Sequence, residues 1–170
     1  MTLHDPGDFE GHCHRSDGGS GKHKNTSAHA VLCNEAHPNC IVCSPNNRLG
    51  LQLEFTMLDD GSVQATFDCG ESFQGYPGIL HGGVISSLLD GAMTNCLFAH
   101  GRQGITGELK IRFRHPVFIH RTAIVRAWVD RLIPPFQVLQ AELIQDEWLK
   151  AKATGRFVER SHFEAKRNHV

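Results

Sequence analysis

The sequence predicts an α+β fold in which one long central helix is wrapped by an antiparallel sheet of about six strands. Residues 84–99 form a stretch of helical length whose only charged residue is Asp90. Two strand-like runs precede this stretch and four follow it, each with alternating apolar residues and bounded by turn residues. This order of elements is typical of one helix packed against a single antiparallel sheet.

The bulk composition fits one domain and excludes several classes of partner. The chain has 170 residues, of which 40% are apolar, and a net charge of −1. This balance predicts no general affinity for nucleic acid or for an acidic membrane surface. No apolar run reaches transmembrane length, and the first ten residues lack the apolar segment of a signal peptide, so we expect a cytoplasmic protein. In that compartment the six cysteines are expected to be reduced.

Composition also divides the chain into three parts. Residues 1–30 are rich in Gly, Ser, His, Asp and Lys and are expected to be a disordered tail. A single domain is predicted over residues 31–160, followed by a frayed polar tail over residues 161–170. In the first tail His12, Cys13 and His14 lack clean metal-ligand spacing, so no metal site is expected there.

Four potential metal ligands precede the first strand: Cys33, His37, Cys40 and Cys43. The C-x-x-C spacing of the last two is that of a zinc knuckle or a redox site, and the other two would complete four ligands. Against a metal, no second C-x-x-C follows, and nearby Pro and Asn residues predict a series of turns. Packing thiols are therefore favoured over zinc, and neither metal nor cofactor is predicted. The alternative is a zinc-dependent interaction module, and metal analysis of the purified protein distinguishes it from packing thiols.

The first two strands are predicted to form a hairpin. From residue 49, apolar positions alternate with polar ones as in a half-buried strand, at Leu51, Leu53, Phe55 and Met57. Residues 59–62, Asp-Asp-Gly-Ser, are expected to form the turn. The returning strand alternates in the same way, with apolar residues at Val63, Ala65 and Phe67.

A glycine-rich loop over residues 69–80 leads into the helix, which is predicted to end near His100 and Gly101. One flank of the helix carries an apolar stripe: Ile85, Leu88, Leu89, Ala92 and Cys96. The other flank is small and lightly polar: Gly83, Ser86, Ser87, Asp90, Gly91 and Thr94. Because a solvated flank normally carries Lys and Glu, we expect both flanks to be covered, with Asp90 on an inner wall.

Four strands are predicted after the helix, over residues 105–114, 122–130, 136–145 and 148–158. The pair Asp146 and Glu147 is expected to form the turn between the last two strands. In the first of the four, alternation places apolar residues on one face: Ile105, Leu109, Ile111 and Phe113.

The opposite face of that strand is mostly charged and comprises Thr106, Glu108, Lys110, Arg112 and Arg114. Its basic row, Lys110, Arg112 and Arg114, is either an exposed face or a contact for the phosphates of a nucleotide-bearing substrate. Glu108 is either a second acid beside Asp90 or, more commonly, a residue of a solvated face.

The helix start and Asp90 form a candidate active site. Helix-start N–H groups are unpaired and carry the positive end of the helix dipole, and Gly82 and Gly83 leave them uncovered, so a carbonyl oxygen can approach closely. Nine residues separate His81 from Asp90, which is ~13.5 Å along a helix axis. If both serve one site, the antiparallel helix of a second copy must supply Asp90. The alternative is a Gly-Gly helix start beside a buried, hydrogen-bonded Asp90.

Other catalytic templates are absent from the sequence. It contains no G-x-S-x-G nucleophile elbow, no P-loop and no G-x-G-x-x-G motif. These absences exclude the α/β-hydrolase, P-loop and dinucleotide-binding mechanisms.

Residues 75–84, Gly-Tyr-Pro-Gly-Ile-Leu-His-Gly-Gly-Val, with Asp90 nine residues after the histidine, resemble the hotdog-fold acyl-CoA thioesterases of the phenylacetate-degradation (PaaI-like) type. Residues 106–117 resemble the strand after the helix in that family, and residues 40–51 resemble a lead-in of some members. The resemblance covers residues 40–158. It implies a long helix wrapped by an antiparallel sheet, homodimers or dimers of dimers, and hydrolysis of acyl-CoA at a site shared between two subunits.

Carried over by position, the resemblance assigns roles to individual residues. Gly82, followed by Gly83, would offer its N–H to the thioester carbonyl, and Asp90 would be nucleophile or general base. His81 would support the loop. Thr106 would lie near the attacking water and Gln74 in the loop where an amide side chain can assist, and both are weaker candidates. Substrate contacts would come from Lys110, Arg112, Arg114 and His115. The sequence departs from the family at His120, where glycine is common.

Two other functions fit the same resemblance. The first is a non-catalytic acyl-CoA binder or sensor that uses the same groove. The second is a hydratase on the same fold, for which His81 and Asp90 would shuttle protons. Asp90 favours an enzyme over a binder, because a passive binder has little use for a carboxylate beside apolar acyl chains.

Overall fold

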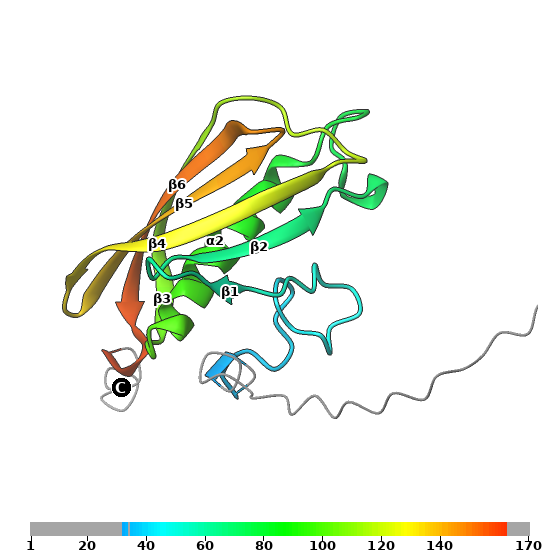
Figure 1. The fold of residues 1–170 in the computed structure, drawn as a ribbon. Helices are drawn as coiled ribbons and strands as arrows, with labels where there is room; N and C mark the ends of the chain where they lie inside the picture. The colour runs from blue at the N-terminus through cyan, green and yellow to red at the C-terminus, as the bar shows by residue number, and fades with distance from the viewer. Residues whose placement is uncertain (1–31, 34, 163–170) are drawn as a thin grey trace, which may run out of the picture.

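In the part of the chain that the structure describes, one long helix packs on one antiparallel sheet, as the sequence predicts (Figure 1). The computed structural model describes residues 32, 33 and 35–162, so the predicted tail over residues 1–30 lies outside the described residues, as does most of the tail over 161–170. The elements are β1 (Thr56–Met57), β2 (Val63–Asp68), the 3-10 helix η1 (Glu71–Phe73), α2 (Gly82–Ala99), β3 (Gly104–Phe113), β4 (Thr122–Ile133), β5 (Phe136–Gln145) and β6 (Trp148–Glu159).

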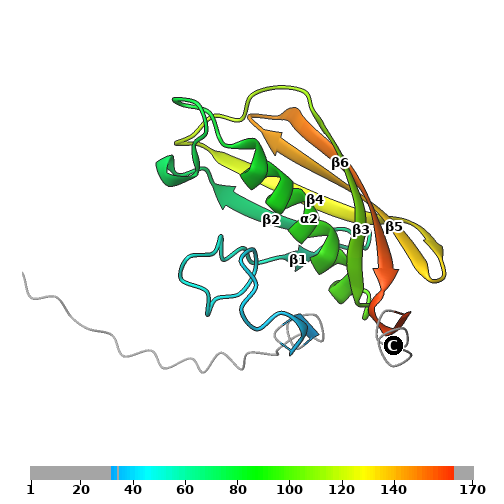
Figure 2. The same ribbon diagram turned by 180° about the vertical axis from the view of Figure 1, so that it is seen from behind.

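The six strands form one sheet in the order β1-β2-β4-β5-β6-β3, and all neighbours are antiparallel. Figure 2 shows α2 lying against one face of this sheet, and the opposite view in Figure 1 shows the strands in front of it. In the described part of the chain, no helix has both the length and the apolar character that crossing a bilayer requires.

The core lies between α2 and the sheet. The predicted apolar stripe of the helix is buried along its whole length: Ile85, Leu88, Leu89, Ala92 and Cys96. Val63, Val125 and Leu139 are among the buried side chains that the strands contribute to the same cluster. Burial of this stripe supplies most of the driving force for docking the helix, because each fully buried Leu or Ile contributes about 1.5–3 kcal/mol.

The first predicted strand is largely wrong. Only Thr56 and Met57 pair with β2. The preceding residues bond elsewhere, since the N–H groups of Leu51 and Leu53 donate to the carbonyls of Ile41 and Val42. Leu53 is nevertheless buried, so the alternation of apolar residues reports burial against the core rather than membership of the sheet. The turn and the returning strand β2 are confirmed, with Val63, Ala65 and Phe67 buried.

The predicted alternation of β3 is wrong at its start. A bulge shifts the β3–β6 register between Thr106 and Glu108, so one extra residue, Gly107, stands in β3. As a result Thr106 faces α2 together with Leu109, and Ile105 is 45% exposed. Glu108 lies on the outer face, 3.7 Å from Arg156, and is not a second acid beside Asp90.

The remaining strands agree closely with the periodicity. β5 has the predicted bounds, β6 is one residue longer, and β4 continues three residues further, to Ile133. Asp146 and Glu147 form the predicted two-residue turn, with φ angles of 53° and 65°, as type I′ hairpin turns require.

The segment before β1, residues 32–33 and 35–53, covers part of the polar flank of α2; we call it the lead-in. A Cβ built on Gly91 would lie 2.4 Å from Cγ1 of Val42, so glycine is what lets the two backbones approach. Further along α2, Cys33 Sγ lies 3.5 Å from Oδ1 of Asn95, and the His37 ring stands edge-on to Phe98 at 4.9 Å. The expectation that both flanks are covered therefore holds for the C-terminal half of the helix.

Gly91→Ala is expected to lower the midpoint of thermal unfolding. Alanine in a helix is normally favoured over glycine by about 1 kcal/mol. Here its methyl would overlap Val42, and overpacking of this kind costs about 1–3 kcal/mol, which outweighs the propensity gain. Calorimetry measures the effect, and the loss should shrink in a Val42→Ala background. An equal loss of stability in both backgrounds would show that overlap with Val42 is not the cause of the destabilisation.

Candidate active site

The start of α2 is capped by the side chain of His81. Its Nδ1 accepts a hydrogen bond of 2.8 Å from the N–H of Gly83. The N–H groups of Val84 and Ile85 both donate to the carbonyl of His81. Among the described residues, no acceptor lies within hydrogen-bond distance of the Gly82 N–H. The two donors expected from Gly82 and Gly83 are thus reduced to one, because His81 occupies the other.

The glycine-rich loop holds His81 in this position. The His81 N–H donates to the carbonyl of Phe73, and the loop closes on itself through a bridge between Gln74 and Leu80. A Cβ on Gly75 would lie 3.1 Å from the His81 ring, so glycine allows the close approach. The Gln74 side-chain oxygen accepts from the Gly78 N–H at 3.2 Å, so the structure shows this amide bracing the loop.

Asp90 and Thr106 meet across the interface between α2 and β3. The hydroxyl of Thr106 donates to Oδ1 of Asp90 at 2.8 Å. The bulge at Gly107 causes this contact, because unbroken alternation would point Thr106 away from the helix. In the described part of the chain, Oδ2 of Asp90 accepts no hydrogen bond and stays available to a substrate or a water molecule.

Partial burial raises the pKa of the Asp90 carboxyl above its ordinary value. The hydrogen bond from Thr106 and the electrostatic interaction with His37 both lower the Asp90 pKa, but burial dominates. A carboxylate with a raised pKa is a stronger base than one in water, and perturbed acids of this kind cluster at functional sites.

The other polar side chains of this flank form hydrogen bonds within α2 itself. Hydroxyl or amide groups donate to the carbonyl four residues earlier at Ser86, Ser87, Thr94 and Asn95. Asp90 is therefore the one acidic group that the flank presents. On the N-terminal side of Asp90 the flank carries only small side chains, whereas on its C-terminal side the lead-in covers Gly91 and Asn95.

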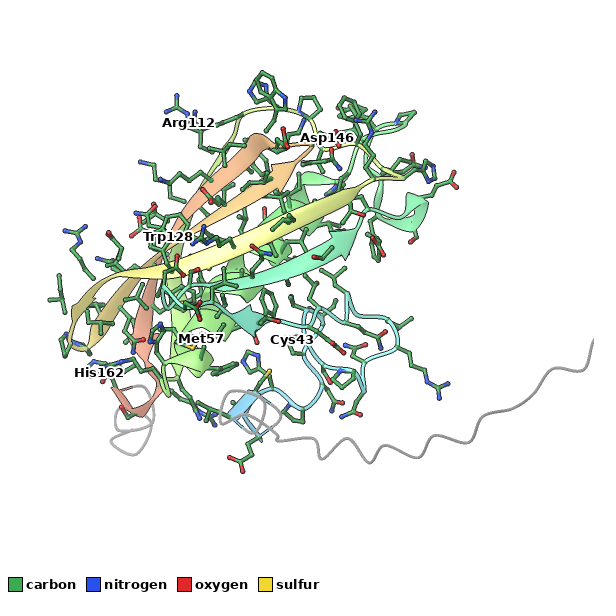
Figure 3. The ribbon with its side chains drawn as sticks, in the orientation of Figure 1. Cys43, Met57, Arg112, Trp128, Asp146 and His162 are labelled. Carbon is green, nitrogen blue, oxygen red and sulfur yellow. The ribbon has the colours of Figure 1, made fainter. Side chains whose placement is uncertain are left out.

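The predicted substrate-binding residues are all exposed: Lys110, Arg112, Arg114 and His115. Figure 3 shows the Arg112 side chain at the outer surface of the molecule. Lys110 and Arg112 share the outer face of β3 with Glu108, opposite the face that carries Thr106. The structure therefore does not bring this basic row to Asp90, and the His115 ring instead stands edge-on to Trp148 at 6.1 Å.

The structure brings Asp90 and Thr106 together but keeps Gly82 apart from them. Gly82 and Asp90 are eight residues apart on one helix, which is ~12 Å along its axis. Two neighbours were not anticipated: Phe113, whose ring lies 3.8 Å from a Cβ built on Gly82, and His37, which interacts electrostatically with Asp90. No periodic signal could have found either, because both contacts depend on tertiary packing.

Comparison with known proteins gives a consistent picture. Residues 77–149 match the family model of the thioesterase superfamily. Among curated proteins, the chain is 28% identical over 114 residues to acyl-coenzyme A thioesterase THEM4 of Bos taurus, which covers 64% of this chain and 47% of that protein. The chain spans about half the length of the curated THEM4 relatives it matches.

Solved structures share the fold. A thioesterase superfamily protein matches with a TM-score of 0.67 and 26% identity, over 69% of this chain and 62% of that one. The PaaI protein of E. coli, from the phenylacetic acid degradation operon, matches with a TM-score of 0.60 and 21% identity, over 64% and 80%. A hypothetical thioesterase protein from Streptococcus pneumoniae with coenzyme A matches equally well, with a TM-score of 0.60 and 21% identity, over 64% of this chain and 88% of that one.

The predicted fold and the predicted resemblance are both confirmed by these matches. One helix on a six-stranded antiparallel sheet is the architecture that the relatives share with this chain. The chain is thus similar to thioesterase superfamily proteins: residues 77–149 match that family's model, and the fold is shared with the PaaI protein of E. coli.

Proposed function

We propose that the protein hydrolyses acyl-CoA thioesters to the free acid and coenzyme A. The observation that carries this proposal is the half-buried Asp90 carboxylate, held by Thr106 on a helix flank of small residues. The relatives named as acyl-CoA thioesterases and as a coenzyme A complex support the substrate class. A cytoplasmic location stays a prediction.

The free N–H of Gly82 is the hydrogen-bond donor that the reaction requires beside the Asp90 carboxylate. It donates to the thioester carbonyl oxygen and stabilises the negative charge that develops there, an effect worth about 3 kcal/mol for one such donor. His81 acts as a positioning residue, because its cap fixes the first turn of α2. Gln74 and Gly83 act in the same supporting way within the loop and helix start.

Asp90 then acts by one of two routes. As a general base it takes a proton from water, the hydroxyl adds to the carbonyl carbon, the C–S bond breaks, and the departing thiolate recovers the proton. As a nucleophile it forms an acyl anhydride while the thiolate leaves, and water then hydrolyses the anhydride. The free Oδ2 suits both routes, since Oδ1 is engaged by Thr106.

Both groups serve one site only if two copies of the chain associate. β3 lies at the edge of the sheet and pairs only with β6 among the described strands. It carries the exposed apolar residues Ile105 and Phe113, at 45% and 53% exposure, and it also carries Thr106. A second copy packed along β3 in an antiparallel sense would bring its α2 start toward Asp90. We therefore propose a homodimer, or a dimer of such dimers.

The basic row contributes to coenzyme A binding in this proposal. Lys110, Arg112 and Arg114 are exposed, and none of them forms an ion pair with another described residue. With Lys110 and Arg112 on the outer face of β3, the nucleotide must cross the edge strand to meet them. His115 follows directly after this row.

Thr106→Val is expected to move the acid limb of the pH–kcat/KM profile to higher pH. Asp90 works only when ionised, so activity falls as the pH drops through its pKa. Thr106 lowers that pKa by donating a hydrogen bond to the carboxylate, and removing the donor lets burial raise the pKa further. Thr106→Ser keeps the donor and should leave the limb in place. A limb that stays fixed in the valine variant would contradict the role of Thr106.

The direct test is release of free thiol from a panel of acyl-CoA substrates with short, long and aromatic acyl groups. We expect turnover of at least one member by the purified protein. Calorimetric titration with the same acyl-CoA panel tests the alternative of a non-catalytic sensor. Binding without turnover would identify a sensor and contradict the proposal. Hydration of an enoyl-CoA without thiol release would identify the hydratase instead.

A further inference from the structure

The four potential metal ligands of the lead-in are gathered in space. One ligand atom each from His37, Cys40 and Cys43 lies within 4.8 Å of the other two. The Sγ atoms of Cys33 and Cys43 are 3.5 Å apart. All four residues are partly buried, and Figure 3 labels Cys43 among them. Three ligand atoms thus share a small volume and the fourth, Sγ of Cys33, contacts one of them, although the residues are spread over eleven positions of the sequence.

The separation between the two sulfurs of Cys33 and Cys43 is that of a tetrahedral metal site. Zinc bound by two cysteine sulfurs at about 2.3 Å holds the two sulfurs about 3.8 Å apart. The measured separation of 3.5 Å between Cys33 and Cys43 is close to this value. It is far longer than a disulfide bond of about 2.05 Å, and the five cysteines that the structure describes are all free.

The backbone of the lead-in is folded so that it presents the four side chains. The N–H of His37 donates to the carbonyl of Cys33, and the N–H of Cys40 donates to the carbonyl of His37. One tight turn thus joins Cys33 to His37, and another joins His37 to Cys40. The N–H of Val42 also points at Sγ of Cys40, at 3.4 Å, an amide contact of the kind that stabilises a metal-bound thiolate.

The cluster also contains a polar atom without a partner. Nδ1 of His37 is buried and neither accepts nor donates a hydrogen bond among the described residues. A buried polar atom left unpaired costs about 1–3 kcal/mol. Binding of a metal through this nitrogen would give it a partner. The packing-thiol interpretation leaves the atom unexplained, and for this reason the geometry favours a metal over packing.

We propose that Cys33, His37, Cys40 and Cys43 bind one zinc ion and form a structural site. Three thiolates and an imidazole are a ligand set typical of zinc, and four protein ligands leave no open position for catalysis. The site joins the lead-in to α2, because Cys33 contacts Asn95 and His37 packs against Phe98. Its function is to hold the lead-in over the flank of α2 that carries Asp90.

The test is the zinc content of the full-length chain, produced without a histidine tag and purified without chelators under a non-thiol reductant. Elemental analysis by inductively coupled plasma mass spectrometry is expected to find about one zinc per chain. Cys40→Ser and Cys43→Ser should each lower this to less than about 0.2 zinc per chain. Cys69→Ala, which removes a buried thiol outside the cluster, should retain the full amount, as should a His12→Ala/His14→Ala variant of the tail.

A second measurement does not depend on how the variants fold. The wild-type chain, stripped by a chelator and titrated with Co²⁺, should bind one equivalent and develop the visible bands of tetrahedral cobalt with thiolate charge-transfer bands. Loss of zinc should also lower the midpoint of thermal unfolding. Wild-type protein that neither contains zinc nor gives these bands would overturn the proposal. A disulfide between Cys33 and Cys43 found by non-reducing peptide mapping would do the same.

Discussion

Asp90→Asn is expected to lower kcat for acyl-CoA hydrolysis at least ~100-fold, as for other enzymes that lose a catalytic acid–base group. The amide has nearly the shape of the carboxylate, and its oxygen can still accept the hydrogen bond from Thr106. Folding should therefore be preserved, while the basicity and nucleophilicity of the side chain are lost. Asp90→Ala should lose at least as much activity, because it also leaves the Thr106 hydroxyl without its partner.

Free-thiol release measures this effect on the acyl-CoA that the wild type hydrolyses fastest. Asp59→Asn is a suitable control, because it makes the same chemical change on the exposed turn before β2. Its activity should match that of the wild type. If Asp90→Asn keeps more than about one tenth of the activity, Asp90 is not the catalytic group.

Gly82→Pro is expected to lower kcat by about 100-fold or more, because it removes the one free N–H at the start of α2. Proline is well tolerated at this first helical position, where the N–H has no partner within the helix. The preceding residue is compatible as well, since His81 has the extended backbone, φ −64° and ψ 135°, that a residue before proline prefers. The substitution thus acts on the hydrogen-bond donor and leaves the helix in place.

Gly82→Ala provides the matched comparison, since alanine retains the N–H. Its Cβ would make an ordinary contact of 3.8 Å with the Phe113 ring, so no rearrangement is required. The loss in kcat should be much smaller than that of the proline variant. Circular dichroism checks that both variants keep the helix. Equal losses in the two variants would mean that bulk at residue 82, and not the donor, limits activity.

Elements whose periodicity is local could be predicted from the sequence. The apolar stripe of α2 and the alternation in β5 and β6 each reflect one packed face, so their bounds agree with the structure within two residues. The turn at Asp146 and Glu147 was predictable because strand-like alternation stops on both sides of this pair. The family resemblance rests mainly on other segments, namely residues 75–84 with Asp90, residues 106–117 and residues 40–51.

The errors arise where a distant part of the chain decides the geometry. Residues 51–55 alternate like a strand, but their hydrogen bonds go to Ile41 and Val42 in the lead-in. In β3, the bulge at Gly107 reverses the faces predicted for Ile105 and Thr106. Local alternation cannot reveal an inserted residue, so only the family resemblance pointed to Thr106.

The sequence predicted which residues belong to the candidate site better than it predicted how they are arranged. Spacing on the helix indicated that Gly82 and Asp90 are too far apart to act within one chain, and the structure keeps them apart. The hydrogen bond between His81 and Gly83 was not anticipated, because a side-chain cap on a Gly-Gly helix start depends on a rotamer that the sequence does not specify. It leaves a single donor, which makes Gly82 the sharper target.

The shared site is tested most directly by combining the two inactive variants in one dimer. Asp90→Asn and Gly82→Pro chains, each carrying a different tag, are co-expressed, and pairs that contain both tags are isolated. If Gly82 of one subunit works with Asp90 of the other, each mixed pair has one intact site of two and should show about half of the wild-type activity. If both groups of a site come from one chain, no site in the mixed pair is intact, and activity would stay at the level of the separate variants.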